Sequence, residues 1–218
     1  MPTLLQLDSS ADLTASRSRA LTAAFAEAWR AAGPDHTVVV RDLHTQPLPH
    51  LADSEQHYAA DLRRPGSAVP PQADALQRQV LDELLAADAL VVGVPTYNYS
   101  MPSTLKAWVD CIHVPGVTVS FDGTLHPMAG RPAVLISTAG GTYDAGTPTE
   151  DWNHAIPPLQ IILGDALGMD VSVIRCTRTL ADRVPGLAPE VDRAAAEFET
   201  ARQEAVAIAQ RLAGVVTG

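Results

Sequence analysis

Hydrophobic and polar residues follow two patterns along the chain. Short runs of apolar, often β-branched residues predict buried strands, and longer segments with apolar residues at helical spacing predict helices between them. Gly33 is the expected C-cap of the first helix, and Pro157 and Pro158 are expected to interrupt the start of the fourth. The expected strands are residues 3–7, 37–40, 89–94, 133–137 and 171–175, and the expected helices are residues 16–32, 73–87, 103–113, 151–167 and 189–212.

Three segments are less regular. Residues 53–63 have a helical composition but a mixed polar pattern, residues 64–72 are the most loop-like, and residues 116–123 predict a β-excursion or hairpin. No internal repeat or low-complexity tract divides the chain. Its 218 residues are therefore expected to form one domain that spans residues 1–218.

The alternation of strands and helices predicts an α/β fold, in which a parallel sheet carries helices on both faces. Of the two common doubly wound arrangements, the dinucleotide-binding one requires Gly-x-Gly-x-x-Gly after the first strand. Here residues 8–18 contain no glycine and are rich in hydroxyl groups. The five-strand order 2-1-3-4-5, whose usual ligand is FMN, is therefore expected.

Charge and composition disfavour several partners. The net charge is −10 and there is no run of Lys or Arg, so no nucleic-acid partner is expected. No stretch approaches the length of a membrane span, and no basic region precedes an apolar block at the N-terminus, so neither a membrane contact nor a signal peptide is expected.

Cysteine and histidine usage points to a cytoplasmic protein without a metal site. Cys111 and Cys176 lie far apart in sequence, which favours two buried thiols in a reducing compartment over a disulfide. The histidines are scattered, and no pair has metal-ligand spacing on one element.

The segment of residues 89–108 is the centre of the predicted site. It begins as an apolar run and changes to helical spacing after residue 102, which is the pattern of a buried strand leading into a helix. Open α/β sheets bind ligands at the carboxyl ends of their strands. Because strands one, three and four are neighbours in the expected order, the loops that follow them are expected to meet in one crevice.

The loop after the first strand has the composition of a phosphate site. A helix N-terminus near residue 16 offers unpaired N–H groups and a partial positive charge, to which serine hydroxyls add donors and an arginine could add a charge. The alternative is that Ser16 only caps the helix while the nearby arginines are exposed, although three hydroxyls at one junction are more than a cap needs. The candidate residues are Ser9, Ser10, Ser16, Arg17 and Ser18.

The loops after the third and fourth strands suit a planar ligand. Tyrosine rings and a carboxamide follow the third strand, and paired glycines, which let backbone N–H groups approach a ligand closely, follow the fourth. Alternatively, the tyrosines are half-buried aromatics beside the sheet, and the glycines form a turn into a flexible segment. The candidates are Pro95, Thr96, Tyr97, Asn98 and Tyr99 in the first of these loops and Thr138, Ala139, Gly140 and Gly141 in the second.

Several short motifs carry a family resemblance over nearly the whole chain. They are Ser9-Ser10, Ser16-Arg17-Ser18, Arg41-Asp42-Leu43, Pro95-Thr-Tyr-Asn-Tyr99, Thr104-Leu-Lys106, Gly116-Val-Thr118 and Ser137-Thr-Ala-Gly-Gly141. In these motifs the chain resembles the FMN-dependent NADH-azoreductase family, relatives of the flavodoxin-like NAD(P)H:quinone reductases. The resemblance implies a flavodoxin-like fold in which the serine loop holds the FMN phosphate, residues 96–99 line the flavin ring and residues 138–141 contact its pyrimidine edge.

The resemblance also implies a homodimer with sites at the subunit interface. Three positions depart from the family pattern: Thr96 stands where Met is usual, Tyr99 where Phe is usual, and Ala139 where Arg is common. These departures are expected to affect acceptor preference and flavin potential more than FMN binding, because most flavin contacts would come from the backbone.

The resemblance implies an enzyme that reduces quinones or azo compounds in two half-reactions, with NADH or NADPH as the electron donor and FMN as the carrier of the hydride. Tyr143 is either a residue of the acceptor pocket or an exposed loop residue. Two alternatives remain open from the sequence: an electron carrier of the flavodoxin type, and a specialist that acts on one natural-product quinone or on an N–N or N–O bond.

Overall fold

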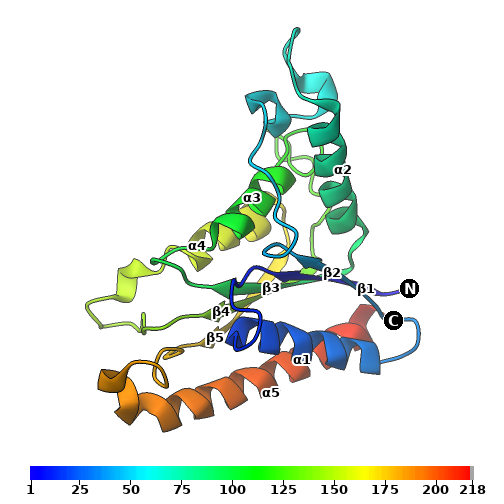
Figure 1. Ribbon diagram of the computed structural model, residues 1–218. Coiled ribbons are helices and arrows are strands. Elements are labelled where there is room, and N and C mark those ends of the chain that lie inside the picture. Colours follow the sequence, from blue (N-terminus) through cyan, green and yellow to red (C-terminus); the bar gives the residue numbers. More distant parts are fainter. Residues whose placement is uncertain (217–218) are drawn as a thin grey trace.

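The computed structural model describes residues 1–216. Its centre is a parallel five-stranded sheet with the order β2-β1-β3-β4-β5, which confirms the expected fold class and strand order (Figure 1). β3, the middle strand, is buried over its whole length, as its uninterrupted apolar sequence requires. The strands are β1 (Thr3–Asp8), β2 (Thr37–Asp42), β3 (Ala89–Pro95), β4 (Pro132–Thr138) and β5 (Asp170–Cys176).

Helices cover both faces of the sheet (Figure 1). α1 and α5 lie on one face, where Phe25 and Trp29 of α1 belong to the same buried cluster as four alanines of α5. The other helices lie on the opposite face (Figure 1). The helices are α1 (Arg17–Ala31), α2 (Pro71–Ala86), α3 (Ser103–Ile112), α4 (Ile156–Leu159), which continues as a π-helix (Gln160–Ala166), and α5 (Val191–Val216).

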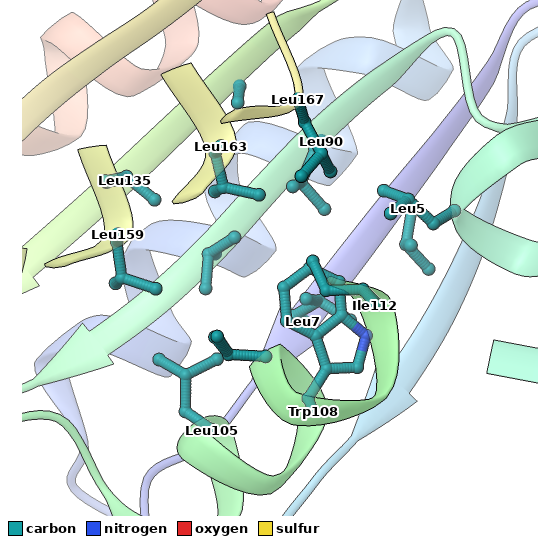
Figure 2. Packing of buried hydrophobic residues seen from close by; sticks show 14 of the residues in the cluster. Leu5, Leu7, Leu90, Leu105, Trp108, Ile112, Leu135, Leu159, Leu163 and Leu167 are labelled. Atoms are coloured by element: carbon teal, nitrogen blue, oxygen red, sulfur yellow. The ribbon is translucent and has the colours of Figure 1, made fainter. Parts of the chain in front are cut away.

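The larger part of the core lies between the sheet and α3 and α4 (Figure 2). Trp108 of α3 is fully buried among leucines from β1 and β3. Fully burying one such side chain contributes about 1.5–3 kcal/mol, so this cluster fixes the helix that follows the β3 loop. The labelled members are Leu5, Leu7, Leu90, Leu105, Trp108, Ile112, Leu135, Leu159, Leu163 and Leu167.

Two expectations about helix ends are wrong. Ala32, not Gly33, is the C-cap of α1, and it has right-handed helical angles; the helix stops without a left-handed residue because Pro34 follows closely. Pro157 and Pro158 do not interrupt a helix. They lie in the first turn of α4, where a missing N–H costs no hydrogen bond.

Two irregular segments also differ from expectation. Residues 53–63 form two separate 3-10 turns, Ser54–His57 and Ala60–Leu62, because the N–H of Ala59 donates to the carbonyl of Pro115 between them. The expected hairpin at residues 116–123 is a turn instead. The hydroxyl of Thr118 accepts from the N–H of Val114 at 3.0 Å. This bond forms a tight turn in the place where the two strands of a hairpin would have to pair.

Neither cysteine is exposed. Cys111 and Cys176 are free, buried thiols, and burial raises the pKa of Cys111 to about 11. Among residues 1–216, we find no helix with the length and apolar character needed to cross a bilayer.

Candidate functional site

The carboxyl ends of β1, β3 and β4 meet at one edge of the sheet. The N–H of Thr96 donates to the carbonyl of Thr138 at 2.8 Å, and the hydroxyl of Ser9 donates to the carbonyl of Gly93 at 2.7 Å. These bonds join the loop after β1 to β3 and the loop after β3 to the end of β4. The ends of the three strands therefore lie together at one edge, where the structure has two clefts instead of the single crevice expected from the sequence.

A cleft of about 390 Å³, here called the serine cleft, opens where α1 begins. Ser16 is the N-cap of α1, and its hydroxyl accepts from the N–H of Arg19 at 3.3 Å and lies 3.1 Å from the hydroxyl of Ser18. Ser18 is buried behind the cleft. The cleft is lined by Ser10, Asp12, Ala15, Ser16, Arg17, Pro95, Tyr97, Thr138, Thr179, Leu180, Asp182 and Arg183.

The first turn of α1 offers backbone donors to this cleft. The N–H groups at its start have no partner within the helix because of helix geometry, and the helix dipole places partial positive charge at the same end. Together with the hydroxyls of Ser10 and Ser16, they form the kind of donor set that binds phosphate. The N-cap role of Ser16 and an anion site are thus compatible.

Arg17 and Arg19 have structural partners. The guanidinium of Arg17 donates to the carbonyl of Ala194 at 2.9 Å and lies over the ring of Phe198, 5.7 Å from its centroid, so it points toward α5. Arg19 donates to both carboxylate oxygens of Asp42 at 2.8 Å and to the carbonyl of Ser10 at 2.7 Å. Arg19 therefore holds the serine loop by its backbone.

These contacts stabilise the ionised form of Asp42. Burial opposes its charge, but hydrogen bonds from Arg19 and from the N–H groups of Thr45 and His44 outweigh burial and lower its pKa to about 2. The Arg19–Asp42 pair therefore persists at neutral pH and ties the loop after β1 to the end of β2.

The loop after β3 is a tight turn. Tyr97 and Ser100 exchange backbone hydrogen bonds at 2.8 and 3.1 Å, and the two residues between them, Asn98 and Tyr99, have φ values of 49° and 70°. Both residues are in the left-handed region, which costs free energy outside glycine and is concentrated at functional sites. The hydroxyl of Tyr97 accepts from the N–H of Ala11 at 2.9 Å, so its side chain links this turn to the serine loop.

A second cleft of about 520 Å³, here called the Tyr143 cleft, lies on the β5 side of the loop after β4. Burial and then the proximity of Tyr99 raise the pKa of Tyr143, so its hydroxyl remains protonated at neutral pH. Ala139 lines this cleft, whereas Thr138 lines the serine cleft. The start of the loop after β4 therefore separates the two clefts.

An aromatic pair stands at the same edge. Trp152 packs edge-on against Tyr99 with ring centroids 5.4 Å apart, and the N–H of His154 donates to the carbonyl of Tyr99 at 2.8 Å. Both rings are about half exposed, at 48% for Trp152 and 50% for Tyr99. Trp152 was not among the predicted site residues, because the segment that contains it has no strand or glycine motif.

Gly140 and Gly141 differ in the space that surrounds them. A Cβ on Gly140 would lie 2.5 Å from Cδ1 of Leu180, whereas a Cβ on Gly141 would have no neighbour within 4 Å. Leu180 belongs to the loop after β5, which the sequence analysis did not assign to the site. Thr179, Leu180, Asp182 and Arg183 of that loop line the serine cleft.

The buried carboxyl of Asp8, at the end of β1, joins the start of the serine loop to α1. Asp8 accepts from Thr22 at 2.7 Å and from Gln6 at 2.8 Å, and burial raises its pKa despite these bonds. A Cβ on Gly93 would approach Thr22 and Asp8 to 3.3 and 3.4 Å. Gly93 therefore lets α1 pack closely on β3.

The groups on this edge fit a phosphorylated flavin. The helix start and hydroxyls suit a phosphate ester, the turns after β3 and β4 provide flat polar backbone, and the cleft volumes fall within the range of roughly 300–1,000 Å³ that is usual for ligand sites. Among residues 1–216, no group of three or more His, Cys, Asp and Glu side chains is arranged to hold a metal ion.

The chain belongs to the flavodoxin-like fold family, whose model matches residues 2–208. It is 56% identical over 212 residues to a Kineococcus radiotolerans protein named FMN-dependent NADH:quinone oxidoreductase, with 97% of this chain and 100% of the relative covered. Among solved structures, an azoreductase from Bacillus anthracis superposes with a TM-score of 0.81 at 21% identity, covering 97% of this chain and all (100%) of that chain. An FMN-dependent NADH-azoreductase from the same species, in complex with FMN, gives 0.78 at 20% identity, with 98% and 100% covered. The family resemblance found in the sequence is confirmed.

Proposed function

We propose that this protein is an FMN-dependent oxidoreductase that takes a hydride from NADH or NADPH and reduces quinones or azo compounds. The observation that carries the proposal is the meeting of a phosphate-type donor set with two strained or glycine-rich loops at the carboxyl ends of β1, β3 and β4. The 56% identity to a protein named FMN-dependent NADH:quinone oxidoreductase supports this assignment. The relatives carry enzyme names, which disfavours the electron-carrier alternative.

In this proposal the serine cleft holds the FMN phosphate. Ser10, Ser16 and the first-turn N–H groups of Arg17 and Ser18 donate to the phosphate oxygens, and the hydroxyl of Ser18 orients that of Ser16 from behind. Arg19 contributes indirectly, because it fixes the carbonyl of Ser10 and thereby the loop. Hydrogen bonds already hold Ser16 and the carbonyl of Ser10 in place, which lowers the entropic cost of the complex.

The flavin ring would lie along the residues after β3 and β4. Pro95, Thr96, Tyr97, Asn98 and Tyr99 provide one wall, and Thr138, Ala139, Gly140 and Gly141 offer backbone groups to the pyrimidine edge. Bound FMN supplies the hydride-transfer chemistry. The protein orients the ring, leaves one face accessible, and places Tyr143, Tyr99 and Trp152 where a flat acceptor can be bound.

We further propose that the protein works as a homodimer with its sites at the subunit interface. The exposed aromatic rings of Tyr97, Tyr99 and Trp152 at the open edge support this, because a partner chain would bury them. Two buried free thiols support a cytoplasmic location. Sedimentation of the FMN-loaded protein tests the dimer: a fully active monomer would contradict it.

An oxidation assay tests the activity. The FMN-loaded protein is supplied with NADH or NADPH and, in parallel, with a quinone, an azo dye or oxygen as the acceptor. Rapid nicotinamide oxidation with the quinone or the azo dye, and slow oxidation with oxygen, is expected. Failure of NADH and NADPH to bleach the bound flavin would overturn the proposed function.

A further inference from the structure

The loop after β5 contains a cation that has no assigned role. We propose that Arg183 supplies the positive charge that pairs with the FMN phosphate in the serine cleft. This inference rests on the proposed function, and it assigns to Arg183 the role that the sequence suggests for Arg17. Three features of Arg183 support this role: its position at the cleft, a guanidinium without a hydrogen-bonded partner in the described part of the chain, and the attachment of its loop to the loop after β4.

Arg183 lines the serine cleft together with Ser10 and Ser16. It is exposed, and within residues 1–216 its side chain makes no ion pair within 4.0 Å and no hydrogen bond. Its charge does act on Asp12, whose pKa is lowered mainly by hydrogen bonds from the N–H groups of Ala15 and Thr14 and to a smaller extent by Arg183. Arg17 lines the same cleft, but its guanidinium is already bound to the carbonyl of Ala194 and stacked over Phe198. Of the two arginines at the cleft, Arg183 is therefore the one whose guanidinium is free to reach an anion.

Two carboxylates stand near the site proposed for the phosphate. Asp12 and Asp182 line the serine cleft, and the whole chain carries a net charge of −10. The carboxylate of Asp12 is occupied, since it accepts from the N–H groups of Thr14 and Ala15 at 3.0 and 2.8 Å. A phosphate dianion that enters beside two carboxylates would be repelled, and a guanidinium, which forms paired hydrogen bonds with phosphate, offsets that repulsion.

The loop that carries Arg183 is attached to the loop after β4 at its start and is closed by its own backbone hydrogen bonds. The N–H of Thr179 donates to the carbonyl of Ala139 at 3.0 Å, and the N–H groups of Arg183 and Val184 both donate to the carbonyl of Leu180 at 3.0 Å. Leu180 packs on Gly140. The loop after β5 is therefore attached to the loop after β4, next to the site proposed for the flavin.

Arg178 anchors the start of this loop. Its φ of 59° is in the left-handed region, which is unusual for arginine. Its guanidinium donates to Glu190 at 2.9 Å and to Thr177 at 2.8 Å, and it also pairs with Glu197. These bonds hold the segment that precedes Arg183 against Glu190 and against Glu197 of α5.

A comparison of FMN with riboflavin tests the proposal, because the two ligands differ only in the phosphate. Binding is measured through the quenching of flavin fluorescence for the wild type and for Arg183→Gln, Arg183→Lys, Arg17→Gln and Arg30→Gln. Arg30 is an exposed arginine at the other end of α1 and serves as the matched control. The titrations are repeated at low and high salt.

Arg183→Gln is expected to weaken FMN binding about ten- to a hundredfold, which is the usual worth of hydrogen bonds to a charged group, and to leave riboflavin binding unchanged. It should also reduce the salt dependence of FMN binding, and Arg183→Lys should restore most of the affinity. Arg30→Gln should leave the ratio of FMN to riboflavin affinity near that of the wild type, and any FMN-specific loss in Arg17→Gln should be smaller than the loss in Arg183→Gln.

Three results would overturn the inference. The first is an unchanged FMN affinity in Arg183→Gln, and the second is an equal loss for FMN and riboflavin. The third is a loss specific to FMN in Arg17→Gln instead. In each case the wild type still binds FMN and the proposed function stands, whereas a wild type that binds no FMN would overturn both.

Discussion

Replacing Ser16 with aspartate separates the structural role of this residue from its proposed role in binding. The Ser16 hydroxyl caps α1 by accepting from the N–H of Arg19. Aspartate is as good an N-cap as serine, so the unfolding free energy of Ser16→Asp should stay close to that of the wild type. Its carboxylate should be ionised at neutral pH, because the helix dipole favours negative charge at this end.

The effect on FMN follows from Coulomb's law. Two like unit charges about 4 Å apart repel by about 4 kcal/mol at an effective dielectric constant of about 20. Since each 1.4 kcal/mol or so corresponds to a tenfold change in affinity, FMN affinity should fall on the order of a thousandfold. Riboflavin, which lacks the phosphate, should be affected far less.

The assay is a fluorescence titration of both flavins, with urea denaturation of each variant to confirm that the fold is intact. Ser67→Asp adds the same charge in an exposed loop and is the matched control. If Ser16→Asp retained FMN affinity while folded, the phosphate would have to bind elsewhere. A parallel loss for riboflavin would show that the substitution disturbs the whole site.

Three further predictions concern other parts of the structure. Asp42→Asn should destabilise the protein at neutral pH. Because the folded pKa of Asp42 is about 2 against an ordinary 3.8, the difference from the wild type in urea denaturation should shrink as pH falls from about 4 toward 2. A difference independent of pH would contradict this. Trp152→Ala should lower kcat/KM for an aromatic quinone about two- to tenfold through loss of a ring contact. FMN affinity should be unchanged, and Trp152→Phe should behave like the wild type. Unaltered kinetics in the alanine variant would rule out a role in acceptor binding. Cys111 is buried with its pKa raised to about 11, so a thiol reagent should label it only on unfolding, and fast labelling of the native protein would refute its placement in the core.

The buried central strand and the order of the strands could be predicted because each depends on a local sequence pattern that fits only one kind of structure. The unbroken apolar sequence of β3 fits only a strand covered on both faces, and it is buried throughout. The absence of glycine after β1 excluded the dinucleotide turn, and the five-strand order then placed the loops after β1, β3 and β4 together.

Other features depend on contacts between distant residues. The guanidinium of Arg17 turns toward Ala194, which is 177 residues away in sequence, and no local pattern encodes that direction. The segment around Thr118 has strand-like composition, but side-chain hydrogen bonds override that preference. The loop that carries Arg183 has no motif. Its place was implied by the order of the strands, because β5 ends beside β4.

The central claim is that the carboxyl edge of this sheet holds one FMN. The most direct measurement is a crystal structure of the protein grown with FMN. The account predicts phosphate density at the first turn of α1, between Ser16 and Arg183, with the ring lying along the turns that contain Asn98 and Gly141. Flavin bound elsewhere, or a serine cleft filled by the protein's own side chains in the presence of excess FMN, would contradict it.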